Sequence, residues 1–268
     1  MSEPLYFSVK KKLLTLDLGN TALTGGVWEG DRLAEKWSEP FTVRKLEARL
    51  REVLSRGEID SAILASVVPE RNLALLGICR RRLGIECRIL TYQTPTGLKN
   101  LYSDPKKVGA DRIANAVGAF RRYGGPVIVV DFGTAITFDV ISKDFEYLGG
   151  VIAPGLGIST EALFRKAALL PRAELVLPRG VLGRETTEAI RSGVYWGTLG
   201  LVERIIRELK RELGWGRETH LIATGGHAHL ILSQSRLIRK IDPHLTLFGL
   251  YLIATQSPSA GEDGESRL

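Results

Sequence analysis

The sequence predicts an α/β protein built from two copies of one structural unit, and two hairpin-like stretches are the main observation behind this prediction. In residues 127–140, four β-branched residues lead into Asp131 and Gly133, and a second run rich in Thr, Ile, Phe and Val follows. This pattern predicts a strand, a tight turn and a second strand. Residues 13–28 repeat it around Asp17 and Gly19. Two copies of one hairpin indicate a duplicated domain with a cleft between the halves.

The residue types at these turns suit a phosphate group. Gly133 lets the backbone take conformations closed to other residues and lets a ligand come close. Thr134 and Thr137 add hydroxyl groups beside it. A carboxylate, backbone N–H groups and hydroxyls at the mouth of a hairpin suit a metal-bound phosphate. The alternative is an ordinary hairpin in which the Asp and the Gly only shape the turn.

The first half of the chain continues with alternating strands and helices. Apolar spacing and turn residues predict strands at 32–37, 61–68 and 86–91, and helices at 43–54 and 70–83. This alternation indicates layers of helices on a sheet. A further helix, from about 105 or 108 to 123, connects the halves. We expect domains at 1–118 and 119–255, followed by a polar tail at 256–268.

In the second half, a third strand is expected at 146–151 and a helix at 160–168, capped by Ser159. Thr186 and Thr187 are candidate caps for a long helix to residue 213, with possible breaks at Gly197 or Gly200. A strand at 220–223 leads into the glycine turn 224–226 and a short helix. A last helix is expected at 244–254.

Composition narrows the class of protein. The 268 residues are 44% hydrophobic and 25% charged, which is typical of a soluble globular protein, and the sequence shows neither a membrane-spanning run nor a secretory signal. Cys79 and Cys87 lack metal-binding spacing, so we expect buried thiols, which fits a cytoplasmic location. Because no apolar run is long enough to span a bilayer, we expect no membrane partner. The net charge of +7 is scattered and no nucleic-acid motif is present. An anionic small-molecule substrate explains this charge without a nucleic-acid partner.

Three acids stand at special positions. Asp17 and Asp131 lie at the two hairpin turns, and Asp111 opens a helix beside Arg112. Two acids can hold cations that neutralise phosphates, while a third accepts a proton from an attacking hydroxyl. Phosphoryl transfer needs this division of roles, because positioning and charge neutralisation supply most of its catalysis. The alternative for Asp111 is a favourable interaction with the helix dipole.

Six short motifs, in this order, resemble those of type III pantothenate kinases, which belong to the superfamily of actin, sugar kinases and heat-shock ATPases. The resemblance covers about residues 13–254. The motifs are Asp17-Leu18-Gly19-Asn20-Thr21, Gly109-Ala110-Asp111-Arg112, Asp131-Phe132-Gly133-Thr134-Ala135, Leu148-Gly149-Gly150, Gly183-Arg184-Glu185-Thr186 and Thr224-Gly225-Gly226.

This resemblance implies a fold and an activity. The fold would be two duplicated ribonuclease H-like (actin-like ATPase) domains, each a mixed sheet with flanking helices, with a cleft between them. The activity would be ATP-dependent phosphorylation of pantothenate to 4′-phosphopantothenate, the first step of coenzyme A biosynthesis. Two alternatives stay open, namely a nucleotide-binding accessory protein without turnover, and a kinase of the same fold acting on another small acid or sugar.

The resemblance also implies roles for individual residues. Asp111 would accept the proton of the pantothenate hydroxyl, and Asp131 would hold a monovalent cation, K⁺ or NH₄⁺. ATP would bind with a divalent cation, for which Mg²⁺ is the first candidate. The substrate-binding residues would be Tyr102, Gly109, Ala110, Asp111, Arg112 and Thr186. The ATP-binding residues would be Asp17, Leu18, Gly19, Asn20, Thr21, Ala22, Leu23, Thr24 and Thr134.

A homodimer with shared active sites completes these expectations. The resemblance implies that Thr186, or the competing Thr187, reaches the pantothenate site of the partner subunit. The long helix supplies a reason for assembly, because its apolar residues exceed what one small sheet can cover. These residues are Val194, Tyr195, Leu199 and Val202.

Overall fold

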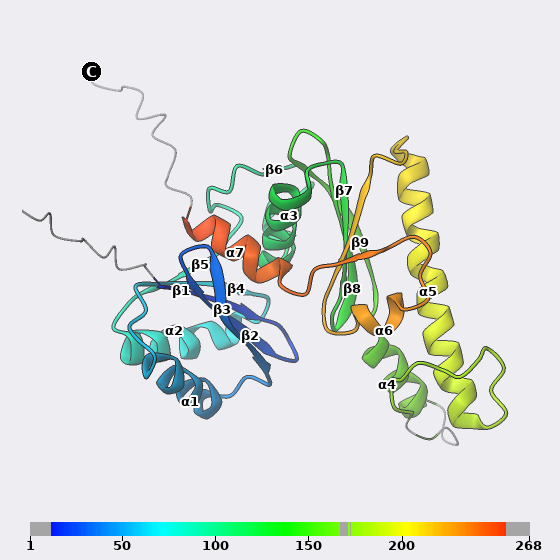
Figure 1. The fold of residues 1–268 in the computed structure, drawn as a ribbon, viewed down its shortest axis with the longest axis horizontal. Coiled ribbons are helices and arrows are strands. Elements are labelled where there is room, and N and C mark those ends of the chain that lie inside the picture. Colours follow the sequence, from blue (N-terminus) through cyan, green and yellow to red (C-terminus); the bar gives the residue numbers. More distant parts are fainter. Residues whose placement is uncertain (1–11, 167–170, 172, 256–268) are drawn as a thin grey trace, which may run out of the picture. The chain divides into compact units, whose positions relative to one another are not determined.

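The computed structural model describes residues 12–166, 171 and 173–255, which divide into two compact units (Figure 1). Among these residues, the first unit comprises 12–96, 108–114 and 246–255, and the second comprises 97–107 and 115–245. The predicted polar tail and the predicted end of the helix at 160–168 lie outside the described residues.

A five-stranded mixed sheet forms the centre of the first unit. Its strands are β1 (Lys12–Leu18), β2 (Leu23–Glu29), β3 (Arg32–Glu39), β4 (Ser61–Ser66) and β5 (Cys87–Ile89), in the spatial order β3-β2-β1-β4-β5. β1 pairs with β2 in antiparallel fashion and with β4 in parallel. The predicted hairpin and third strand are therefore present, and β1 becomes the central strand.

Both faces of β1 are buried, which explains its nearly continuous apolar sequence. Leu14 and Leu16 belong to the core formed with α1 (Val43–Leu54) and α2 (Pro69–Leu83). On the other face, Trp28 of β2 donates its indole N–H to Thr15 at 3.0 Å. The same indole stacks on Tyr251 of α7 (Leu245–Thr255), with ring centroids 4.5 Å apart.

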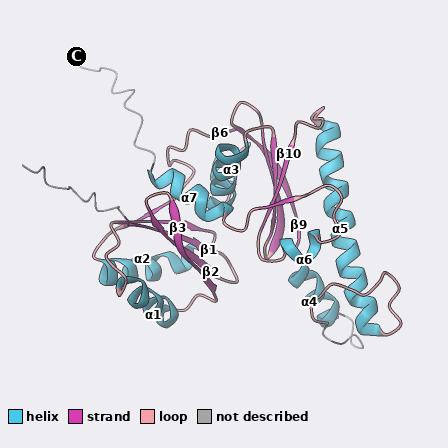
Figure 2. Ribbon diagram, in the orientation of Figure 1, coloured by secondary structure: helices cyan, strands magenta, loops and turns pink. Residues whose placement is uncertain are grey.

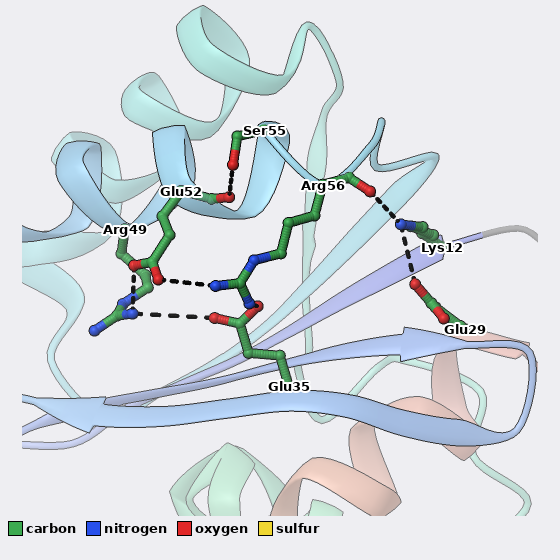
Figure 3. Close-up of polar contacts among 7 residues, drawn as sticks. All are labelled: Lys12, Glu29, Glu35, Arg49, Glu52, Ser55 and Arg56. Atoms are coloured by element: carbon green, nitrogen blue, oxygen red, sulfur yellow. Dashed lines mark hydrogen bonds and ion pairs between the residues drawn. The ribbon is translucent and has the colours of Figure 1, made fainter.

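Ion pairs attach α1 to the neighbouring strand β3 (Figure 3). Arg56, just after α1, lies 2.7 Å from the carboxylate of Glu35 and 3.1 Å from that of Glu52. Arg49 lies 2.6 Å from Glu52. The carbonyl of Arg56 accepts a hydrogen bond from the Lys12 ammonium at 2.9 Å. Because these groups are partly exposed, each pair contributes about 0.2–1 kcal/mol at most.

The second unit repeats the strand order of the first. Its sheet contains β6 (Lys99–Asn100), β7 (Val127–Phe132), β8 (Ala135–Ile141), β9 (Glu146–Pro154), β10 (His220–Thr224) and β11 (Lys240–Ile241). The spatial order is β11-β10-β7-β8-β9-β6. If β7, β8, β9, β10 and β11 are matched to β1, β2, β3, β4 and β5, the two orders are the same, and β6 is added at the edge. The duplication predicted from the two hairpins is therefore confirmed.

Helices cover both faces of this second sheet (Figures 1 and 2). The helices α5 (Thr186–Glu212) and α6 (Ala228–Leu232) pack on one face, where they form a core with Ile128 and Val130. The helix α3 (Ala110–Tyr123) lies on the opposite face. A 3₁₀ turn, η1 (Pro105–Lys107), precedes α3, and α4 (Leu156–Lys166) follows β9. Within the described part of the chain, every helix is too short or too polar to cross a bilayer.

Several predicted boundaries in this unit are wrong. Ser159 lies inside α4 instead of capping it, because α4 starts at Leu156 and β9 extends to Pro154. The residue before α5 is Glu185, so neither Thr186 nor Thr187 is its N-cap. The helix α5 runs unbroken through Gly197 and Gly200 over 27 residues. Packing against the core keeps it helical where local glycine preference predicts a break.

Candidate active site

The two hairpin turns place their aspartates at equivalent positions. Asp17 on β1 is opposite Thr24 on β2, and Asp131 on β7 is opposite Thr137 on β8. In the first turn, the N–H of Gly19 donates to the carbonyl of Ala22 at 2.9 Å. The second turn is tighter, with the N–H of Gly133 donating to the carbonyl of Ala135 at 3.1 Å. Each unit thus presents a carboxylate one residue before the end of its central strand.

The side chains of the first hairpin divide into buried and accessible groups. Leu18 and Leu23 are buried in the core, so only their backbone is available to a ligand. Asn20 and Thr21 are exposed at the tip, and Asp17 is partly buried. In the second hairpin, Thr134 is exposed at the tip. The side chains that a ligand could reach are therefore the polar ones at the two turns.

Asp131 is surrounded by glycine turns and by a buried amide. Its Oδ2 accepts a hydrogen bond from the Nδ2 of Asn115 at 3.1 Å. A Cβ added at Gly225 would lie 2.5 Å from Oδ1 of Asp131 and 2.6 Å from backbone atoms of Phe132. Gly225 also has a φ of +90°. The turn after β10 can therefore approach the Asp131 carboxylate only because it carries glycine at this position.

The backbone after β9 packs against the tip of the same hairpin. A Cβ added at Gly155 would collide with the carbonyl of Thr134 and lie 2.7 Å from that of Gly133. Only glycine therefore allows the backbone to come this close at position 155. Through this contact, the start of α4 packs against the hairpin tip.

Asp111 lies in the first turn of α3, beside a glycine that its carboxylate requires. A Cβ added at Gly109 would collide with Oδ1 of Asp111 and lie 3.4 Å from the side chain of Val67. The same Oδ1 accepts a hydrogen bond from the N–H of Arg112 at 2.8 Å. Gly109 therefore allows the carboxylate to fold back over the start of the helix.

The surroundings of Asp111 change its acidity. Burial raises the pKa of the Asp111 carboxyl above its ordinary value. The hydrogen bond from the Arg112 backbone and the positive charge of Arg112 oppose this rise of the pKa. The side chain of Asp111 still reaches solvent in part, whereas Ala110 and Arg112 are buried. A partly accessible carboxylate with a raised pKa can serve as a proton acceptor.

Tyr102, predicted to contact the substrate, stands in the second unit over β9. Its ring lies 6.4 Å from that of Tyr147 and about 4 Å from the point where a Cβ would stand on Gly149. The hydroxyl of Tyr147 donates to Asp139 at 2.8 Å. The backbone N–H of Tyr102 donates to the side chain of Asn100 at 3.0 Å. The ring of Tyr102 thus packs near the buried ring of Tyr147 and stays partly accessible to solvent.

Thr186 lies on a groove between α4 and α5. The groove has a volume of about 890 Å³, and its walls are largely apolar. Gly193 and Gly197 of α5 lie along it, as do Leu163 of α4 and Leu201 of α5. Thr186 is exposed, whereas Thr187 is partly buried.

The apolar residues of α5 that were expected to form the dimer surface are not available for assembly. The four apolar residues expected to be exposed, Val194, Tyr195, Leu199 and Val202, are buried in the core of their own unit. That expectation is wrong, because they face the sheet together with Ile128 and Val130. The accessible side of α5 is the groove side with its two glycines.

The donor set at Asp131 bears on which cation this site could hold. Among the described residues, no group of three or more His, Cys, Asp or Glu side chains could hold a metal ion. A single carboxylate beside a glycine turn that leaves no room for a Cβ fits a weakly held cation with oxygen ligands. The residues present therefore fit the monovalent cation that the resemblance implies.

Comparison with known proteins decides the family. The family model described as type III pantothenate kinase matches residues 13–208. A type III pantothenate kinase from Roseiflexus sp. (strain RS-1) is 44% identical over 250 residues, covering 90% of this chain and 97% of that protein. This chain belongs to the type III pantothenate kinase family. The family resemblance predicted from the six motifs is confirmed.

Solved structures show the fold of this family member. A putative Baf family transcriptional activator from Campylobacter jejuni matches with a TM-score of 0.58 and 21% identity, covering 90% of this chain and 96% of that one. A ROK family glucokinase from Streptomyces griseus matches with a TM-score of 0.54 and 13% identity, covering 91% and 98%. At such identities the likeness concerns the fold alone. It confirms the predicted α/β fold with two mixed sheets and flanking helices.

One residue of this kinase-family site was missed at the sequence level. Asn115 is fully buried and donates to Asp131, although the two are distant in sequence. A signal was present, because Asn115 follows Asp111 by one helical turn and interrupts an otherwise apolar stretch of α3. A polar amide in such a stretch requires a partner, but the sequence alone does not say which one.

Proposed function

We propose that this protein transfers the γ-phosphoryl group of ATP to pantothenate, forming 4′-phosphopantothenate. The observation that carries the proposal is Asp111, a partly accessible carboxylate with a raised pKa in the Gly109-Ala110-Asp111-Arg112 motif. Its setting fits a proton acceptor for the substrate hydroxyl, because a base works best when its pKa approaches the working pH. Membership of the type III pantothenate kinase family supplies the substrate.

The remaining substrate contacts follow from the motif and from Tyr102. Gly109 and Ala110 leave little side chain in front of the carboxylate, and the buried Arg112 adds positive charge near it. Pantothenate is itself a carboxylate, so a guanidinium in its site is chemically apt. The supported ring of Tyr102 supplies a surface with a polar tip.

ATP binding is assigned to the two hairpins. We expect Asp17, Asn20, Thr21 and Thr24 to contribute side chains, and Thr134 to contribute from the second tip. Leu18, Gly19, Ala22 and Leu23 would contribute backbone groups, since the side chains of Leu18 and Leu23 belong to the core. A divalent cation bound with ATP would neutralise the charge that develops on the phosphates during transfer.

Asp131 is assigned to a monovalent cation, K⁺ or NH₄⁺. The fit of its carboxylate to the glycine turn at Gly225 supports this assignment. Such a cation would supply positive charge beside the phosphates. The protein's own contribution is to hold the carboxylate in place and to keep the turn close to it.

A homodimer with shared sites is the last part of the proposal. The groove between α4 and α5 supports it, because this surface is apolar and open and includes Thr186 at the start of α5. Large exposed apolar surfaces of this kind mark interaction sites. The exposure of Thr186, compared with the partly buried Thr187, favours Thr186 as the residue that reaches the partner's substrate.

The decisive experiment measures ATP consumption with pantothenate, common sugars, acetate and glycerol, each with and without K⁺. Among these substrates, we expect turnover only with pantothenate. Mass spectrometry of the product should give the mass of 4′-phosphopantothenate. Turnover with a sugar or another acid would instead indicate a different kinase of this fold. ATP binding without turnover on any substrate would favour the nucleotide-binding accessory protein.

A further inference from the structure

The two carboxylate oxygens of Asp131 have different surroundings. Oδ2 accepts a hydrogen bond from the Asn115 amide at 3.1 Å. Oδ1 faces the two glycine turns, since a Cβ at Gly225 would lie 2.5 Å from it and a Cβ at Gly133 would lie 3.7 Å from it. One oxygen therefore faces the protein interior at α3, and the other faces the turns assigned to phosphate and cation.

Asn115 of α3 is itself fully buried, and its partner Asp131 belongs to β7 of the second sheet. A buried side-chain amide costs free energy unless it is hydrogen-bonded, and a bond to a charged group is among the stronger ones. The amide carries no charge, so it orients the carboxylate without neutralising it. An arginine or lysine at this position would compete with any cation for the charge of Asp131.

We infer that Asn115 is a positioning residue, which fixes Asp131 so that Oδ1 is the oxygen presented to the monovalent cation. The inference rests on the cation role assigned to Asp131 in the proposed function. It adds a residue on a different element, so that α3 sets the geometry of a site formed by β7 and the turn after β10. A purely structural Asn115 would attach α3 to β7 without affecting the response to K⁺.

The test compares Asn115→Leu and Asn115→Ser with a matched control, Thr219→Val. Leucine removes the amide donor at similar size, and serine is too short to reach Asp131. Thr219 is also buried, and it donates one side-chain hydrogen bond, at 3.0 Å to the carbonyl of Gly216. Its substitution therefore removes one such bond from the same unit without touching Asp131.

Two readouts are used on the full-length protein. The first is the rise of the thermal unfolding midpoint when choline is replaced by K⁺ at constant ionic strength, which requires no turnover. The second is the K⁺ concentration for half-maximal activity. We expect both Asn115 variants to lose the rise caused by K⁺. Their half-activating K⁺ concentration should increase by about tenfold to a hundredfold, the factor expected from losing one hydrogen bond to a charged group.

The outcomes separate this inference from the proposed function. If the unmodified protein responds to K⁺ and both Asn115 variants keep its half-activating concentration within about twofold of the Thr219→Val value, the positioning role is refuted and the cation role stands. If the unmodified protein turns over pantothenate but ignores K⁺ in both readouts, the cation role fails and this inference fails with it. Should one Asn115 variant not fold, the other decides.

Discussion

Burial raises the pKa of the Asp111 carboxyl, and this has opposite consequences for catalysis and for stability. A carboxyl whose pKa is higher in the folded than in the unfolded protein binds its proton more tightly when folded. Its contribution to stability is therefore greatest below the ordinary carboxyl pKa and is lost as the pH rises through the folded pKa. Above the ordinary carboxyl pKa, the burial of Asp111 therefore destabilises the fold, while the same carboxyl serves as a proton acceptor.

Asp111→Asn should therefore lose turnover and gain stability together. We expect kcat to fall by about 10²–10⁴-fold, the usual contribution of a general base, with a smaller change in pantothenate binding. The thermal unfolding midpoint at neutral pH should rise, and the difference from the unmodified protein should shrink as the pH falls into the acid range. Steady-state kinetics and thermal unfolding check both parts, with the exposed Asp31→Asn as control. Near-full turnover in the variant would show that Asp111 is not the proton acceptor and only stabilises the start of α3.

At the scale of single elements, the turn after β10 carries a sharp requirement for glycine. Gly225 has a φ of +90° and no space for a Cβ, whereas its neighbour Gly226 has open space around it. Gly225→Ala should cost about 1–3 kcal/mol of unfolding free energy and displace Asp131, lowering activity as well. Gly226→Ala should stay within about 0.5 kcal/mol of the unmodified protein. Denaturant unfolding measures both, and equal losses in the two variants would contradict the geometry of this turn.

In the helix α5, by contrast, we predict that a glycine substitution raises the free energy of unfolding. Gly200 lies in its exposed middle, with no atom near the position of an added Cβ. Gly200→Ala should stabilise the protein by about 0.5–1 kcal/mol, because alanine loses less conformational freedom than glycine in a helix interior. The unfolding midpoint in urea provides the measurement. A destabilised variant would mean that the backbone at Gly200 is packed against something that the structure of one chain does not contain.

The elements differ in how far local sequence determines them. The hairpins around Asp17 and Asp131 were predictable, because strands buried on both faces have continuous apolar sequences and glycine marks the turns. The start of α4 was not predictable, because β9 continues to Pro154 and Gly155 packs against the hairpin tip. The continuity of α5 likewise depends on its core contacts, which override the local preference of its glycines.

The candidate site divides in the same way. The motif around Asp111 was predictable as a short pattern, and the structure adds the reason that position 109 must be glycine. The role of Asn115 was not predictable, because its partner Asp131 stands on another element. The side of α5 available for assembly was also misjudged, since the sequence shows which residues are apolar but not which of them the chain's own sheet covers. Both of these last points depend on long-range packing, which the local sequence does not show.

At the scale of the whole molecule, the proposed homodimer predicts that two chains share each site. The groove between α4 and α5 offers an apolar surface where Gly193 and Gly197 would let another helix come close. Two-fold dimers are the commonest way for a protein to cover such a surface. Thr186 lies on this groove, so a partner seated there would lie against Thr186.

Mixing two inactive variants tests the shared site. Asp111→Asn removes the proton acceptor, and Thr186→Trp blocks the contact that we assign to the partner's site. In a heterodimer with shared sites, one site carries both changes and the other carries neither. After complete subunit exchange of an equal mixture, half the dimers are heterodimers with one intact site of two, so about a quarter of full activity should return. Each variant incubated alone provides the control, and exchange is followed with a mass-tagged chain. Absence of recovery after proven exchange, or a monomer in sedimentation at assay concentration, would refute the shared site and leave the kinase assignment intact.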